Sequence, residues 1–161
     1  MHSKNQYTNN HMNSFSHLSA DEFSKLVKAP LYIGLLIAEA DGEADHKEIE
    51  WIEKVTYFRI KTAHHTMRTY YRHANEFIKE NLNIERSNLP TNQAEKMNYL
   101  SDKLAELKPI LAKLDEGFSH RLLDSFHSMA LSMAEISGGL LNFFSTNPAE
   151  EKWLALEMLI D

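Results

Sequence analysis

The sequence contains no cysteine. This absence excludes disulfide bonds, zinc fingers, iron–sulfur clusters and thiol catalysis, and it fits a reducing compartment. Glycine and proline are also scarce, at five and four residues of 161, which excludes collagen-like and low-complexity chains. The longest hydrophobic stretch, residues 29–38, has about half of the ~20 residues that a membrane-spanning helix needs. We therefore expect a cytoplasmic protein without membrane insertion.

The remaining composition is that of a soluble globular chain, with 43% apolar, 10% aromatic and 25% charged residues. The formal net charge of −6 argues against nucleic-acid binding, because neutralising phosphates requires clustered Lys and Arg. Residues 1–17 are polar and rich in Asn, Ser and His, which predicts a flexible tail. Residues 18–161 are expected to form one domain.

Helical signals run through this domain, and no strand pattern occurs. Ser19 with Glu22 and Asp45 with Glu48 have the spacing of capping boxes, which mark helix starts. Apolar residues at three- and four-residue spacings then predict amphipathic helices. The expected boundaries are helices over about 19–28, 30–41, 45–59, 63–80, 92–107, 110–114, 118–137 and 147–160, with a loop over 81–93 and a helix end or kink at Pro109.

A short internal repeat suggests two related halves. Residues 38–42 read Ala-Glu-Ala-Asp-Gly, and residues 134–138 read Ala-Glu-Ile-Ser-Gly. Each segment closes a strongly apolar helix and precedes an acid-capped one. We therefore predict an all-α domain of about seven to eight helices with a pseudo-twofold internal repeat.

The same residues resemble the TerB-like family, named for bacterial tellurite-resistance proteins. The resemblance rests on the buried helix that ends in Ala-Glu-Ala-Asp-Gly-Glu and on Glu48, seven residues after Asp41. It implies an all-α fold with two-fold symmetry and a role in tellurite or general stress response, with metal binding at the helix junction. The matching acids are Asp41, Glu43, Asp45 and Glu48. The second copy keeps the glycine, at Gly138, but departs from the pattern because Ser137 stands where Asp is expected and the loop that follows, to Asn147, is longer. This departure leaves a second site in doubt.

The acidic segment allows two interpretations. Hard divalent cations prefer several oxygen ligands, and carboxylates at Asp41, Glu43, Asp45 and Glu48 could converge on Ca²⁺, Mg²⁺, Mn²⁺ or Zn²⁺. The spacing is not that of an EF-hand, in which Gly is sixth and Glu twelfth. Alternatively, Asp45 and Glu48 cap a helix, Asp41 supports a turn, and the function is metal-independent docking of another protein or a homodimer.

The chain shows no catalytic signature. It lacks a nucleophile elbow, a glycine-rich phosphate loop and a Cys nucleophile, so we expect no enzyme and no organic cofactor. The nine His residues include no pair four residues apart on one predicted helix, as a zinc site would need. A basic stripe at Lys61, His64, Arg68 and Arg72 is interpreted as a solvated helix face rather than a nucleic-acid surface.

Overall fold

The computed structural model describes residues 14–137 and 148–160, and helices are the only regular secondary structure in this part of the chain. Its elements are α2 (Ala20–Ala38), α3 (His46–Thr62), η1 (His65–Met67), α4 (Arg68–Ser87), α5 (Gln93–Ala105), α6 (Lys108–Leu111), α7 (Glu116–Ile136), α9 (Pro148–Leu154) and η2 (Glu157–Leu159). The all-α prediction is confirmed for these residues. None of their helices is long and apolar enough to cross a membrane.

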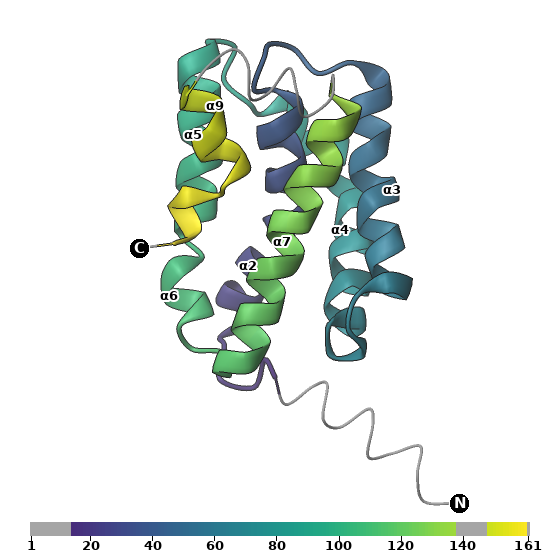
Figure 1. Cartoon of the computed structure of the whole chain (residues 1–161), viewed down its shortest axis with the longest axis vertical. Coiled ribbons are helices and arrows are strands. Elements are labelled where there is room, and N and C mark those ends of the chain that lie inside the picture. The colour runs from purple at the N-terminus through teal and green to yellow at the C-terminus, as the bar shows by residue number, and fades with distance from the viewer. Residues whose placement is uncertain (1–13, 138–147, 161) are drawn as a thin grey trace, which may run out of the picture.

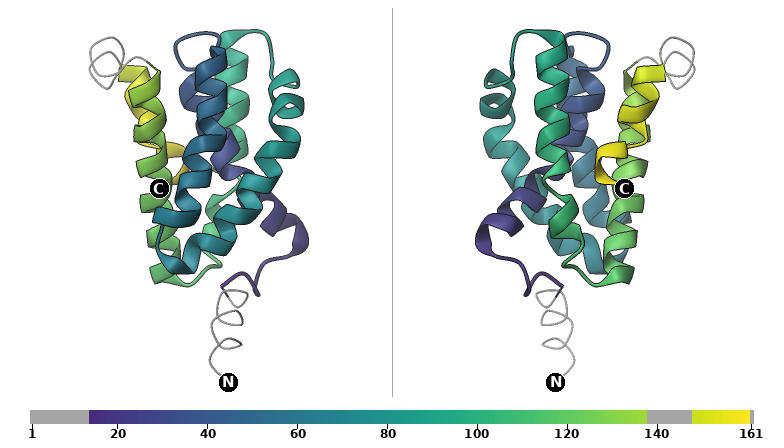
Figure 2. Two further views of the ribbon diagram at one scale, coloured as in Figure 1. Left: turned by 90° about the vertical axis from the view of Figure 1, so that its right-hand side faces the viewer. Right: turned by 90° about the vertical axis from the view of Figure 1, so that its left-hand side faces the viewer.

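Helix α2 is the centre of the bundle. It contacts α3, α4, α5 and α7, and the other long helices run roughly along the same axis (Figures 1 and 2). The sequence explains this position, because residues 29–38 are apolar on every face and all ten are buried. Gly34 lies against Ile52 of α3, and a Cβ on Gly34 would stand 2.7 Å from the Ile52 Cγ2 atom. The missing side chain therefore permits the close approach of these two helices.

The predicted break between residues 28 and 30 is wrong, because α2 continues through Pro30. Proline has no amide hydrogen, so the carbonyl of Leu26, four residues earlier, loses its helical donor. The buried hydroxyl of Tyr70 donates to this carbonyl at 2.7 Å. A side chain from α4 thus replaces the hydrogen bond that proline removes.

The predicted loop over 81–93 is also too long. Helix α4 continues to Ser87, and the loop begins at Asn88. The last turns of α4 are held by contacts to distant parts of the chain: Glu85 accepts a hydrogen bond from the Tyr32 hydroxyl at 3.1 Å, and Arg86 donates to the carbonyl of Ala44 at 2.8 Å. These contacts outweigh the low helix propensity of an Asn-rich segment.

Three local predictions are confirmed. Ser19 and Glu22 form a capping box, Asp45 and Glu48 form another, and Asn92 accepts a hydrogen bond from the amide of Glu95. Helix α5 ends at Ala105, before Pro109, and Pro109 lies in the first turn of the short α6. The predicted cap at Asn147 and the end of the long helix at Gly138 lie outside the described residues.

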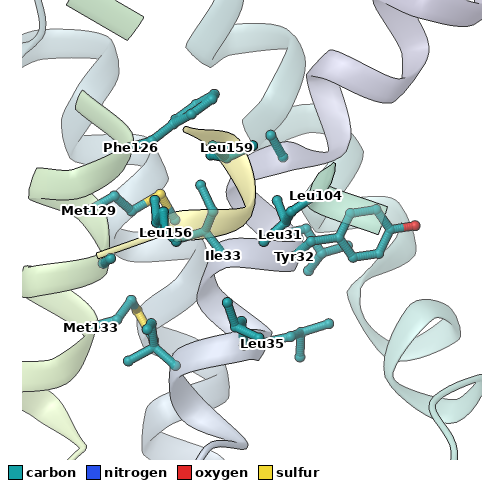
Figure 3. Packing of buried hydrophobic residues seen from close by; sticks show 14 of the residues in the cluster. Leu31, Tyr32, Ile33, Leu35, Leu104, Phe126, Met129, Met133, Leu156 and Leu159 are labelled. Atoms are coloured by element: carbon teal, nitrogen blue, oxygen red, sulfur yellow. The ribbon is translucent and has the colours of Figure 1, made fainter. Parts of the chain in front are cut away.

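The C-terminal segment packs into the bundle instead of forming one continuous helix. Helix α9 ends at Leu154, and Leu156 adopts a left-handed conformation with φ 50° and ψ 43°. This conformation turns the chain so that Leu156 and Leu159 lie among Ile33 of α2 and Met129 of α7 (Figure 3). The predicted helix to residue 160 is therefore too long.

Candidate functional site

The acidic turn, residues 39–48, connects α2 to α3 at one end of the bundle (Figure 1). Gly42 has φ 144°, which L-residues with side chains rarely adopt, and it allows the chain to reverse between the two antiparallel helices. The turn brings five carboxylates into one short segment. They differ strongly in burial, and that difference decides what each can do.

Glu39 is the buried member of the turn. Its side chain is 2% exposed, and its Oε2 atom accepts a hydrogen bond from Lys96 Nζ at 2.8 Å. The Arg86 Nε atom lies 3.7 Å from Glu39 Oε1. These two cations come from α5 and α4 and compensate the buried charge. Gln93 also donates to the carbonyl of Glu39 at 2.6 Å, so the turn is bound to the α4–α5 side of the bundle.

Asp45 and Glu48 begin α3 and cap each other. Asp45 Oδ1 accepts from the amide of Glu48 at 2.8 Å, and Glu48 Oε2 accepts from the amide of Asp45 at the same distance. Each carboxylate therefore uses one oxygen to cap the helix, and its second oxygen remains outside the capping box. The negative charges also lie at the positive end of the helix dipole, which stabilises them.

Asp41 and Glu43 are the exposed members. Asp41 makes no hydrogen bond or ion pair to any residue that the structure describes. The Glu43 side chain is 87% exposed, and its Oε1 atom lies 4.0 Å from Arg86 Nη2, at the limit of an ion pair. Both carboxylates are therefore free to rotate toward a ligand.

These four acids share one surface. Asp41, Gly42, Glu43, Asp45 and Glu48 line a shallow open hollow together with Ile136 and Ser137 from the end of α7. The hydroxyl oxygen of Ser137 is buried and has no hydrogen-bond partner in the described structure. The hollow thus combines carboxylate oxygens from the turn with an unsatisfied hydroxyl from a helix far away in sequence.

The side chains do not yet form a coordination sphere. Within residues 14–137 and 148–160, no three His, Asp or Glu side chains are grouped closely enough to hold a metal ion. The His residues on α3 and α7 have other partners: His46 lies 3.1 Å from Glu50, and His127 contacts the carbonyl of Ala155 at 2.8 Å. A cation at the turn would have to draw in Asp41 and Glu43.

Sequence reasoning missed the cations that hold the turn. Lys96 and Arg86 lie 57 and 47 positions from Glu39, and no local spacing relates them to it. The only signal was the density of acids, which requires positive charge nearby.

Comparisons with known proteins give no assignment. No protein family, no curated protein and no solved structure matches this chain. The function must therefore be inferred from the site itself.

Proposed function

We propose that this chain is a TerB-like, non-enzymatic protein that binds a divalent cation at the acidic turn. The observation that carries the proposal is the hollow shared by Asp41, Glu43, Asp45 and Glu48. Among the described residues, Arg86 and Lys96 are the cations that pair with the five carboxylates of the turn: both contact Glu39, and Arg86 also lies 4.0 Å from Glu43. A cation relieves the remaining repulsion, and the oxygen ligands suit Ca²⁺, Mg²⁺ or Mn²⁺ better than softer metals.

The free oxygens define the expected ligand set. Asp45 and Glu48 each have one oxygen outside the capping box, and Asp41 and Glu43 have both. Because Asp41 and Glu43 must give up solvent-exposed positions to bind, their ordering opposes binding. We therefore expect weak affinity, with a dissociation constant of about 10⁻⁴–10⁻³ M, rather than the tighter binding of an EF-hand sensor or buffer protein.

The internal repeat supports the same interpretation. Ser137 matches Asp41 in the repeat, and both residues line the hollow. This neighbourhood fits the proposed pseudo-twofold domain of seven to eight helices, in which equivalent positions meet near the symmetry axis. Because serine contributes a neutral hydroxyl, the proposal includes one cation site and not two.

The biological role that we propose is a cytoplasmic stress response related to tellurite resistance. Tellurite is an oxyanion, so the acidic turn repels it. Any protection is therefore indirect, through the cation-bound protein or a partner that it engages. No catalytic step is part of the proposal.

Thermal unfolding of chelator-treated protein tests the cation site. We expect one of Ca²⁺, Mg²⁺, Mn²⁺ or Zn²⁺ to raise the melting temperature by about 5–10 °C when it is present at ~100 times its dissociation constant. Asp41→Asn should abolish this shift and leave the melting temperature in chelator unchanged, because Asp41 has no hydrogen-bond or ion-pair partner among the described residues. Glu80→Gln, an exposed acid on α4, is the matched control and should retain the shift. A wild-type protein that responds to none of the four ions contradicts the proposal.

The alternative function is a metal-independent interaction module. Two exposed apolar side chains favour it: Phe58 on α3 is 56% exposed and Leu131 on α7 is 42% exposed. In this case the acidic turn only caps α3 and anchors it to α4 and α5. Asp41→Asn would then leave both stability and partner binding unchanged.

A further inference from the structure

A groove runs between α3 and α7. It has a volume of about 360 Å³. The two helices that form it lie on the side of the bundle away from α5 (Figure 1). Most of its lining side chains are apolar or carry a hydroxyl group, and two are charged. Those that matter below are Trp51, Phe58, Arg59, Ser128, Glu135 and Ile136.

Aromatic side chains from α3 line this groove. Phe58 is 56% exposed, and Trp51 lies seven residues before it on the same helix. The indole nitrogen of Trp51 is buried without a hydrogen-bond partner in the described structure. Clustered aromatic side chains of this kind are typical of protein–protein contacts, where they supply most of the binding energy.

The two charged side chains that line the groove, Arg59 and Glu135, lie at different heights along the helix axes. Arg59 Nη2 donates to Ser128 Oγ at 3.0 Å, which places Arg59 and Ser128 at the same height. Glu135 lies seven residues further along α7, or about 10 Å at 1.5 Å per residue. Helix α3 runs antiparallel to α7 (Figure 1). Trp51, eight residues before Arg59, is therefore about 12 Å from Arg59 in the same direction, near the height of Glu135. The groove therefore has a basic end and an acidic, Trp-bearing end.

Because its two ends have opposite charge, this groove is complementary to the same groove of a second copy that is related to it by a two-fold rotation. When a second copy is placed face to face about an axis through the midpoint, Arg59 of each copy faces Glu135 of the other. The same rotation places Phe58, at the height of Arg59, against Trp51 and Ile136 of the second copy. Isologous contacts of this kind, in which one patch meets itself, are the commonest basis of homodimers.

We propose that the α3–α7 groove is a homodimer interface in which Phe58 inserts beside Trp51 of the second copy and Arg59 pairs with its Glu135. The interface is separate from the acidic turn, although Ile136 lines both the groove and the hollow. It does not depend on the proposed cation. Dimerisation therefore persists in the presence of a chelator.

Sedimentation equilibrium of the full chain in chelator, over a wide range of protein concentration, tests the interface. The wild-type protein should show a monomer–dimer equilibrium. Phe58→Asp should weaken dimerisation at least about tenfold, because it places a charge in the apolar contact. Ile84→Asp is the matched control, because Ile84 is also 56% exposed but lies on α4, and it should dimerise like the wild type.

Charge reversal identifies the pairing. Arg59→Glu and Glu135→Arg should each weaken dimerisation, since like charges then face each other, and the double variant should restore it. Circular dichroism melting of each variant shows whether the monomer remains folded. A wild-type chain that stays monomeric throughout, a double variant that is no tighter than the single ones, or an equal effect of Ile84→Asp would overturn the proposal.

Discussion

Tyr70 donates its hydroxyl hydrogen to the carbonyl of Leu26 at 2.7 Å, and this carbonyl is the one that Pro30 leaves without a helical donor. Both groups are fully buried. A buried carbonyl without a partner is costly, so the bond explains how a proline is tolerated inside the central helix.

Tyr70→Phe should lower the free energy of unfolding by about 1–3 kcal/mol, because the Leu26 carbonyl then stays buried and unsatisfied. In the Pro30→Ala background residue 30 regains an amide that can donate to Leu26, and the cost of Tyr70→Phe should fall. A double-mutant cycle measured by urea unfolding gives this coupling. Equal costs in the two backgrounds would show that the hydroxyl does not replace the proline's missing donor.

Lys96→Met should lower the free energy of unfolding by about 2–4 kcal/mol, because it leaves the Glu39 carboxylate buried beside Arg86 alone. Lys103→Met is the control, since Lys103 pairs with Glu106 at the surface and should cost less than about 0.5 kcal/mol. Denaturant unfolding of both variants provides the measurement. Adding Glu39→Gln to Lys96→Met should recover part of the loss, and no recovery would argue against an uncompensated charge as the cause.

The stability of the protein should fall between pH 10 and about pH 12. Burial raises the pKa of Tyr71 from 10 to about 12, although its hydrogen bond to Ser125 acts in the opposite direction. Because the folded-state pKa is raised, this contribution is complete below pH 10 and is lost as pH rises through the folded value. Tyr71→Phe should reduce the loss over this range by about 2 kcal/mol in unfolding experiments. Tyr57→Phe, at an exposed position, should leave the pH dependence unchanged.

Gly34→Ala should destabilise the protein by about 1–3 kcal/mol, because the new methyl group would stand 2.7–2.8 Å from the Ile52 side chain. Ile52→Ala alone should also destabilise, by leaving a cavity. The two changes together should cost less than their sum, since the methyl group fills part of that cavity. Thermal unfolding of the three variants measures this, with Gly117→Ala as a control: its Cβ meets nothing closer than 3.4 Å, and it should be neutral or slightly stabilising.

Local patterns predicted where helices begin, and distant contacts decided where they continue. Ser19, Asp45 and Asn92 were found from sequence because each cap depends on a residue three positions later. The continuity of α2 was not found, because the donor that permits Pro30 is 40 residues away on α4. The extension of α4 was missed for the same reason, since its end is held by Tyr32 and Ala44.

In the candidate site, too, the sequence predicts local features and not those that depend on distant contacts. Its acids are visible in the sequence as a dense cluster, and the cap formed by Asp45 and Glu48 follows from their spacing. The burial of Glu39 and its pairing with Lys96 depend on how α5 packs against the turn. The groove between α3 and α7 likewise requires the packing of two helices that are more than fifty residues apart.

The central position of α2 also has a consequence during protein synthesis. Helix α2 is made before the helices that cover it, and the last residue of its partner α7 follows 98 residues later, from Ala38 to Ile136. At 5–20 residues per second this delay lasts roughly 5–20 s. Throughout it the most apolar segment of the chain has an incomplete shell, which makes α2 the segment of the nascent chain that a ribosome-associated chaperone would bind.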